Sequence, residues 1–169
     1  MPHRAGGPCD ATGAWSSAVA GLRGRLVRTG ERVELELDNV SARPLELHWA
    51  GYRLAFATFR LDDASGAEVP EPDWRYGGNE ATGRQHLLLA TGTTRVVVGD
   101  PIFGEVSGRR TVRIGAFWGR EMPADGSPRF LRARVIGAQP SSGELDPDTS
   151  AARGVVWLGS LDVPPVCLR

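Results

Sequence analysis

The feature that most constrains the fold is a regular alternation of apolar and polar residues between positions 32 and 49. The run Arg32-Val33-Glu34-Leu35-Glu36-Leu37-Asp38 alternates strictly, and Pro44-Leu45-Glu46-Leu47-His48-Trp49 does so again after a break at 39–42. Successive side chains of a strand point to opposite faces, so the apolar residues of both runs fall on one face. The pattern therefore predicts two successive strands of a half-buried antiparallel sheet.

Short segments of the same kind cover most of the chain. Branched, aromatic or alternating runs predict strands at 22–28, 31–39, 43–49, 52–61, 67–69, 85–90, 93–98, 110–118, 129–136 and 154–161. Segments rich in Gly, Pro and polar residues predict long surface loops at 70–83 and 137–153. We expect eight to ten short strands, no substantial helix, and a single all-β antiparallel sandwich of Greek-key type. A small antiparallel barrel fits the same pattern.

The length of 169 residues suits one domain with its own core. The Gly/Pro-rich residues 1–14 are expected to form a flexible tail, and residues 15–169 the sandwich domain. We expect three tryptophans on apolar faces to fill the space between the sheets: Trp49, Trp118 and Trp157.

The charge balance argues against two classes of partner. The chain has 20 basic and 20 acidic residues, so it lacks the net positive charge of a nucleic-acid or anionic-membrane binder. No apolar run approaches the roughly 18 residues of a transmembrane helix. Residues 1–9 also contain no apolar stretch of the kind found in a signal peptide.

The two cysteines, Cys9 and Cys167, lie near opposite ends of the chain. A disulfide between them would enclose nearly the whole domain, and loop-closure entropy gives about 5 kcal/mol as an upper figure for its stabilisation. A count of cysteines does not establish pairing, so two unrelated thiols are an equal alternative.

Three stretches together resemble a bacterial immunoglobulin-like sandwich domain of unassigned role, found in extracytoplasmic or multidomain proteins. They cover residues 15–26, 37–47 and 157–166. The middle stretch is also similar to the opening of the BsuPI family of intracellular proteinase inhibitors. The resemblance implies an immunoglobulin-like fold and slightly favours an extracytoplasmic location. It implies no catalytic residue.

Catalysis is not expected. The three histidines, His3, His48 and His86, lie in no recognisable nucleophile or metal motif, and the alternation predicts that His48 points to solvent. The acidic run at 144–150 carries oxygen ligands of the type that Ca²⁺ prefers, but it lacks the Gly and the distal Glu of a calcium-binding loop. We expect a solvated acidic loop there, with no catalytic residue, metal or cofactor.

The loop at 70–83 is the best candidate for recognition, and the residues predicted to bind a ligand or partner are Trp74, Arg75, Tyr76 and Asn79. The alternative is that the two aromatic rings fold back and cover the open end of the core. The sequence thus predicts a non-catalytic binding or protein-interaction module whose partner is a protein or a glycan. A proteinase inhibitor that presents loop 70–83 or 137–153 is one alternative, and a carbohydrate-binding module is another.

Overall fold

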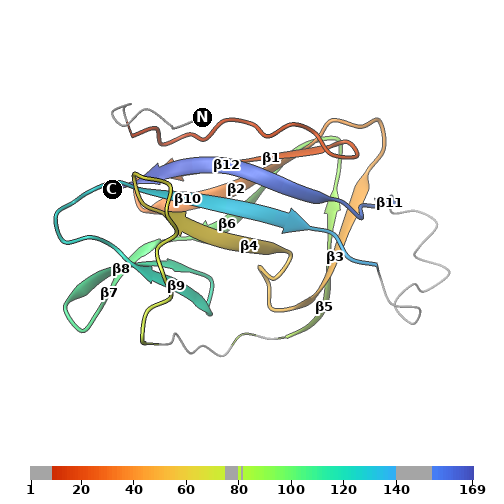
Figure 1. The fold of residues 1–169 in the computed structure, drawn as a ribbon. Coiled ribbons are helices and arrows are strands. Elements are labelled where there is room, and N and C mark those ends of the chain that lie inside the picture. Colours follow the sequence, from red (N-terminus) through yellow and green to blue (C-terminus); the bar gives the residue numbers. More distant parts are fainter. Residues whose placement is uncertain (1–8, 75–79, 81, 140–153) are drawn as a thin grey trace.

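The computed structural model describes residues 9–74, 80, 82–139 and 154–169 (Figure 1). These residues form twelve strands and no helix, so none of them builds a helix able to cross a membrane. The strands are β1 (Leu22–Thr29), β2 (Arg32–Asn39), β3 (Leu45–Gly51), β4 (Ala57–Asp62), β5 (Gly83–Leu89), β6 (Gly92–Gly99), β7 (Phe103–Val106), β8 (Arg109–Ile114), β9 (Trp118–Glu121), β10 (Arg129–Ile136), β11 (Val155–Val156) and β12 (Ser160–Leu168). The prediction of an all-β chain is confirmed, although the described strands outnumber the predicted eight to ten.

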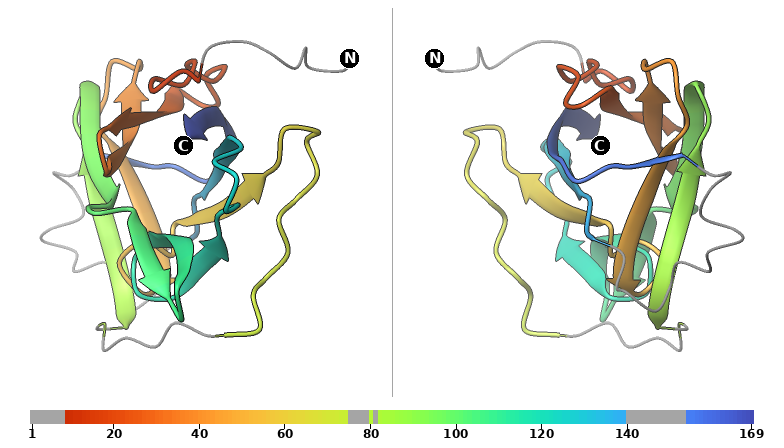
Figure 2. Two further views of the ribbon diagram at one scale, coloured as in Figure 1. Left: turned by 90° about the vertical axis from the view of Figure 1, so that its left-hand side faces the viewer. Right: turned by 90° about the vertical axis from the view of Figure 1, so that its right-hand side faces the viewer.

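The strands make four three-stranded sheets, ordered β1-β2-β6, β12-β10-β4, β11-β3-β5 and β7-β8-β9. Figure 2 shows β2, β3, β5 and β6 on one side of the molecule and β4, β10 and β12 on the other, with β7 to β9 near one end. This layering is consistent with a β-sandwich. Every pairing between strands is antiparallel except that of β11 with β3, which corrects the expectation of a purely antiparallel sandwich.

The alternating segments form the strands that they predict. In β2 the side chains of Val33, Leu35 and Leu37 are completely buried, and in β3 those of Leu45 and Leu47 are buried. These residues pack into one core that spans both layers. The alternation therefore determines which face of each strand turns inward.

The tryptophans pack as predicted, with one difference in depth. Trp157 is fully buried and its indole nitrogen donates to the carbonyl of Val19 at 2.9 Å, whereas Trp49 and Trp118 are partly buried against the core. A Cβ atom at Gly137 or Gly159 would collide with Trp157. These two glycines give the large ring its space.

The predicted long strand at 52–61 is wrong in its first half. Residues 52–56 form turns, in which Ala55 N donates to Tyr52 O at 2.9 Å and Ala57 N donates to Leu54 O at 3.0 Å, and β4 begins only at Ala57. Leu54 and Phe56 are nevertheless buried. Their apolar character therefore reports burial and not a strand.

Two other predicted strands are divided. Residues 110–118 separate into β8 and β9, and residues 154–161 separate into β11 and the start of β12. Strand β12 continues through Pro164 and Pro165, where the pairing with β10 shifts in register. Proline is tolerated there because β12 lies at the edge of its sheet, where its backbone needs no N–H toward a further strand.

Residues 9–19, which we call the N-terminal strap, lie beside β1 and reach β12. Gly13 N donates to Leu26 O at 2.8 Å, Ser16 N donates to Gly24 O at 2.9 Å, and Cys167 N donates to Asp10 O at 3.1 Å. Cys9 and Cys167 form a disulfide, with their Cα atoms 5.2 Å apart. The expected flexible tail at 1–14 therefore differs from the structure from residue 9 onward, because backbone hydrogen bonds hold this part against the sheets; residues 1–8 lie outside the described chain.

Candidate functional site

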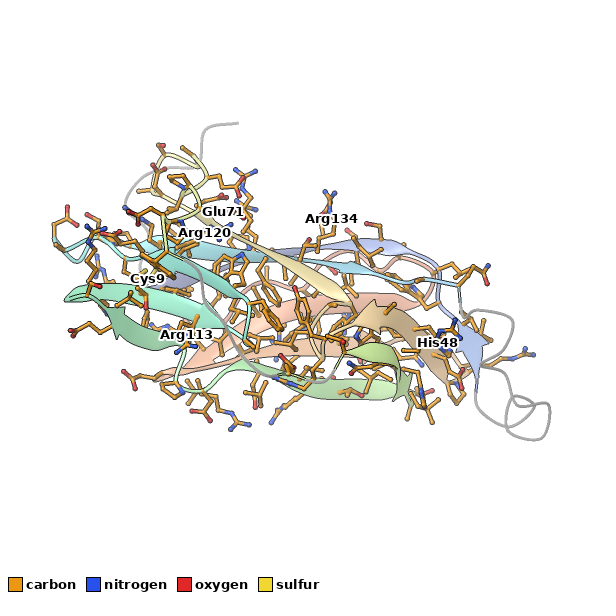
Figure 3. All side chains as sticks on the ribbon, turned by 90° about the horizontal axis from the view of Figure 1, so that it is seen from below. Cys9, His48, Glu71, Arg113, Arg120 and Arg134 are labelled. Atoms are coloured by element: carbon orange, nitrogen blue, oxygen red, sulfur yellow. A yellow bond between two sulfur atoms is a disulfide. The ribbon has the colours of Figure 1, made fainter. Side chains whose placement is uncertain are left out.

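A hollow of about 450 Å³ lies between the segment that follows β4 and the small sheet at the end of the molecule. Figure 3 shows Glu71 and Arg120, one from each side, close to each other. The hollow is lined by Glu71, Pro72, Asp73, Trp74, Phe117, Gly119 and Arg120. Its volume is in the usual range for small-ligand sites.

Trp74 is the one residue of the predicted recognition set that the structure describes. It is half-buried and forms part of the wall of the hollow. Arg75, Tyr76 and Asn79 lie outside the described residues. The structure thus brings Trp74 together with Phe117 and Arg120, two residues that sequence reasoning did not select.

Arg120 is the most unusual group in the hollow. Its side chain is only 9% exposed, and its guanidinium lies over the ring of Trp118, 4.7 Å from the ring centre. Nη1 donates to the carbonyl of Gly119 at 2.8 Å, whereas Nε is fully buried and makes no hydrogen bond with the described residues. Nη2 is 3.8 Å from Oε1 of Glu71, whose side chain is 85% exposed. The buried guanidinium of Arg120 therefore lines the hollow with part of its hydrogen-bonding capacity unused among the described residues.

The position of Arg120 follows from the pairing of β8 with β9. Ile114 pairs with Trp118, and Val112 pairs with Arg120. The side chains of Trp118 and Arg120 therefore lie on the same face of the sheet as the buried residues of β8. Trp118 is fixed by its own hydrogen bond, from Nε1 to the carbonyl of Phe59 at 3.1 Å. The fixed ring of Trp118 thus holds the guanidinium of Arg120 in place through a cation–π contact.

Phe117 adds an apolar wall. Its side chain is 40% exposed, and its ring lies 4.8 Å from that of Tyr52. An exposed phenylalanine beside a hollow is a surface on which the apolar part of a ligand can be buried.

The described walls combine one guanidinium, two carboxylates and two aromatic rings. Glu71 and Asp73 accept hydrogen bonds, Arg120 donates them, and Trp74 and Phe117 offer apolar contact. This arrangement can bind and orient a ligand.

A second hollow, of about 480 Å³, lies beside β6 and β7 and contains Arg53 and Arg113. Arg53 donates to the carbonyl of Val97 at 3.1 Å and lies 3.9 Å from Glu80. No lining residue of this hollow has a buried polar side-chain atom without a hydrogen-bond partner among the described residues, unlike Arg120 in the first hollow, so we consider it the weaker candidate.

His48 does not point into solvent, and that prediction is wrong. Its side chain is 12% exposed, Nε2 lies 3.0 Å from Oε2 of Glu46, and its ring stacks on that of His86 with ring centres 5.8 Å apart. The reason is cross-strand packing, because His48 of β3 lies directly opposite His86 of β5.

Among the described residues, no group of three or more His, Cys, Asp or Glu side chains is placed to hold a metal ion. His3 and the acidic run at 144–150 lie outside the described residues.

Comparisons with protein-family models, with curated proteins and with solved structures found no match to this chain. The resemblances to the immunoglobulin-like domains and to the BsuPI inhibitors accordingly remain expectations from the sequence.

Proposed function

We propose that this chain is a non-catalytic binding module, built as an immunoglobulin-like Greek-key sandwich, whose ligand site is the hollow at Trp74 and Arg120. The observation that carries the proposal is the buried guanidinium of Arg120, whose Nη2 makes no hydrogen bond with the described residues and lies 3.8 Å from Glu71 in the wall of the hollow. The site lies outside the main strands, on a connecting segment and at the end of a small sheet, where sandwich domains commonly place recognition.

The energetics favour a ligand at this position. A buried donor without an acceptor costs about 1–3 kcal/mol, and more when the group is charged. Nε itself is covered by the protein, so a ligand oxygen would pair with Nη2, the nitrogen that lies 3.8 Å from Glu71 and makes no hydrogen bond with the described residues. Trp74 and Phe117 stand beside Arg120 and would contribute apolar contact at the same time.

The inhibitor hypothesis receives less support. A proteinase inhibitor presents an extended loop that stands clear of its own domain, whereas Trp74, within loop 70–83, is half-buried and lines a hollow with residues of β9. In the other candidate loop, residues 140–153 lie outside the described chain.

Thermal unfolding of the full chain in the presence of candidate ligands tests the proposal, because a ligand that binds only the native state raises its stability. The panel contains neutral and acidic polysaccharides, peptides, Ca²⁺ and proteases. We expect at least one of them to raise the melting temperature of the wild type. The Trp74→Ala variant should lose this rise.

The matched control is Trp15→Ala, which removes another half-buried indole, one that stacks against Arg23 and Arg25. It should retain the ligand-induced rise. If Trp74→Ala fails to fold, Phe117→Ala replaces it, since Phe117 is 40% exposed. A rise that persists in the variants of the hollow, or no rise with any member of the panel, would contradict the proposed function.

A further inference from the structure

We infer that the hollow binds a neutral carbohydrate, whose hydroxyl groups bridge Arg120 to the carboxylates of Glu71 and Asp73. This inference rests on the proposed function, because it names the ligand class of the same site.

The charges in the hollow argue against a ligand of either sign. The described walls carry two carboxylates, Glu71 and Asp73, and one guanidinium, Arg120. An anionic ligand would share the hollow with two carboxylates, and a cationic ligand would share it with the buried guanidinium. A neutral ligand avoids both repulsions.

The unfilled hydrogen-bonding capacity points to hydroxyl groups. Nη2 of Arg120 makes no hydrogen bond with the described residues, and the two carboxylates that line the same hollow accept hydrogen bonds but donate none. A hydroxyl both donates and accepts, so one hydroxyl can accept from Arg120 and donate to a carboxylate. The 3.8 Å between Nη2 and Glu71 is longer than a direct hydrogen bond. Neighbouring hydroxyls of a sugar ring supply several such groups at once.

The apolar walls complete the match. A sugar ring has apolar C–H groups on its faces and hydroxyls around its edge, and the hollow has aromatic rings at Trp74 and Phe117 beside the polar groups. A hollow of about 450 Å³ also suits one or a few sugar units better than a protein surface. Stable protein interfaces bury on the order of 1,600 Å² and are generally flatter than such a hollow.

Affinity gel electrophoresis of the full chain tests the ligand class. The neutral probes are β-glucan, arabinoxylan and galactomannan, and the acidic probes are polygalacturonate and alginate. We expect at least one neutral polysaccharide to retard the wild type at low and at high NaCl concentration. We expect neither acidic polysaccharide to do so.

Variants of the polar groups identify the contacts. Arg120→Lys keeps the charge but removes the planar fork and Nε, and it should weaken retardation about tenfold. Glu71→Gln and Asp73→Asn change exposed residues, so the fold is retained, and each should weaken retardation several-fold. Arg134→Gln is the matched control, because Arg134 is an exposed arginine of β10 that is paired with the exposed Asp162 and does not line the hollow (Figure 3). It should leave retardation unchanged.

Two results would overturn the inference. No retardation by any neutral probe rejects a neutral carbohydrate, and the thermal panel then shows separately whether the hollow binds a peptide or another ligand. Retardation by acidic probes alone, weakened by Arg120→Lys, also rejects the neutral class while it supports the hollow as the binding site.

Discussion

At the residue scale, arginines neutralise carboxylates that lie buried on the outer faces of the sheets. The carboxylate of Glu36 on β2 forms ion pairs with Nε of Arg25 at 2.6 Å and with Nε of Arg95 at 3.0 Å. Asp62 of β4 receives Arg60 and, at 2.7 Å, Arg132. Arg25, Arg95 and Arg132 come from neighbouring strands, whereas Arg60 lies on β4 itself. Each buried acid therefore joins two or more strands through its charge as well as through the backbone.

Asp62→Ala tests the value of such a buried acid. Its side chain is 3% exposed and holds two arginines, and hydrogen bonds to a charged group contribute about 1.5–3 kcal/mol. Because both arginines are partly exposed and can return to water, we expect a net loss of about 1–2 kcal/mol in the free energy of unfolding, measured in urea. Asp162→Ala is the control, since this acid is 76% exposed and holds one arginine; it should cost at most about 0.5 kcal/mol. Equal losses for the two variants would refute the account.

The direction of side chains was predictable at this scale, but their exposure was not. Alternation correctly placed Val33, Leu35 and Leu37 in the core, because the strand period is a local property. It also placed His48 on the outer face, where Glu46 and His86 cover it. Arg120 was missed because its burial depends on Trp118, on strand pairing and on a segment some 50 residues away.

At the element scale, the N-terminal strap connects the edge of β1 to the edge of β12. Ala11 O accepts from Arg28 N at 2.6 Å on the β1 side, and Asp10 O accepts from Cys167 N on the β12 side. A Cβ on Gly13 would lie 3.1 Å from carbonyl oxygens of both Leu26 and Pro165. Backbone groups of two edge strands are thereby covered, which protects them from pairing with another chain.

The Cys9–Cys167 disulfide should contribute much of the strap's hold. It closes a loop of 158 residues, for which chain entropy gives about 5 kcal/mol as an upper figure. We expect reduction, or the double variant Cys9→Ser with Cys167→Ser, to lower the free energy of unfolding by about 2–5 kcal/mol in urea. Reductant should have no effect on the double variant, which serves as the control. A wild type that is equally stable with and without reductant would argue against this role.

Sequence patterns predicted strands better than they predicted edges. The strand at 129–136 matches β10, and 22–28 matches β1 to within a residue, since each is a local run of branched and apolar residues. Residues 9–14 fall within the predicted tail because the composition of residues 1–14 as a whole is Gly/Pro-rich, although the strap itself contains a single Gly and no Pro. Its order comes from two strands far along the chain and from a disulfide that a count of cysteines leaves undecided.

At the scale of the whole molecule, the candidate site exists only because distant segments meet. Residues 71–74 belong to the segment that follows β4, and residues 117–120 lie at the start of β9, the last strand of the small sheet (Figures 1 and 3). Composition identified Trp74 as a recognition residue, whereas its partners Phe117 and Arg120 depend on how the small sheet sits against the loop. Half of the site was therefore accessible to sequence reasoning, and the half that carries the buried charge was not.

The most direct test of the central claim is a map of NMR chemical-shift changes over the whole chain, including the indole N–H and arginine Nε–H signals. The probes are cellohexaose, xylohexaose and mannohexaose, added in turn. The account predicts that at least one of them produces its largest changes at Trp74, Phe117 and Nε of Arg120, with little change at the Trp15 indole. Changes concentrated elsewhere, for example around His48 and His86, or none with any of the three, would contradict it.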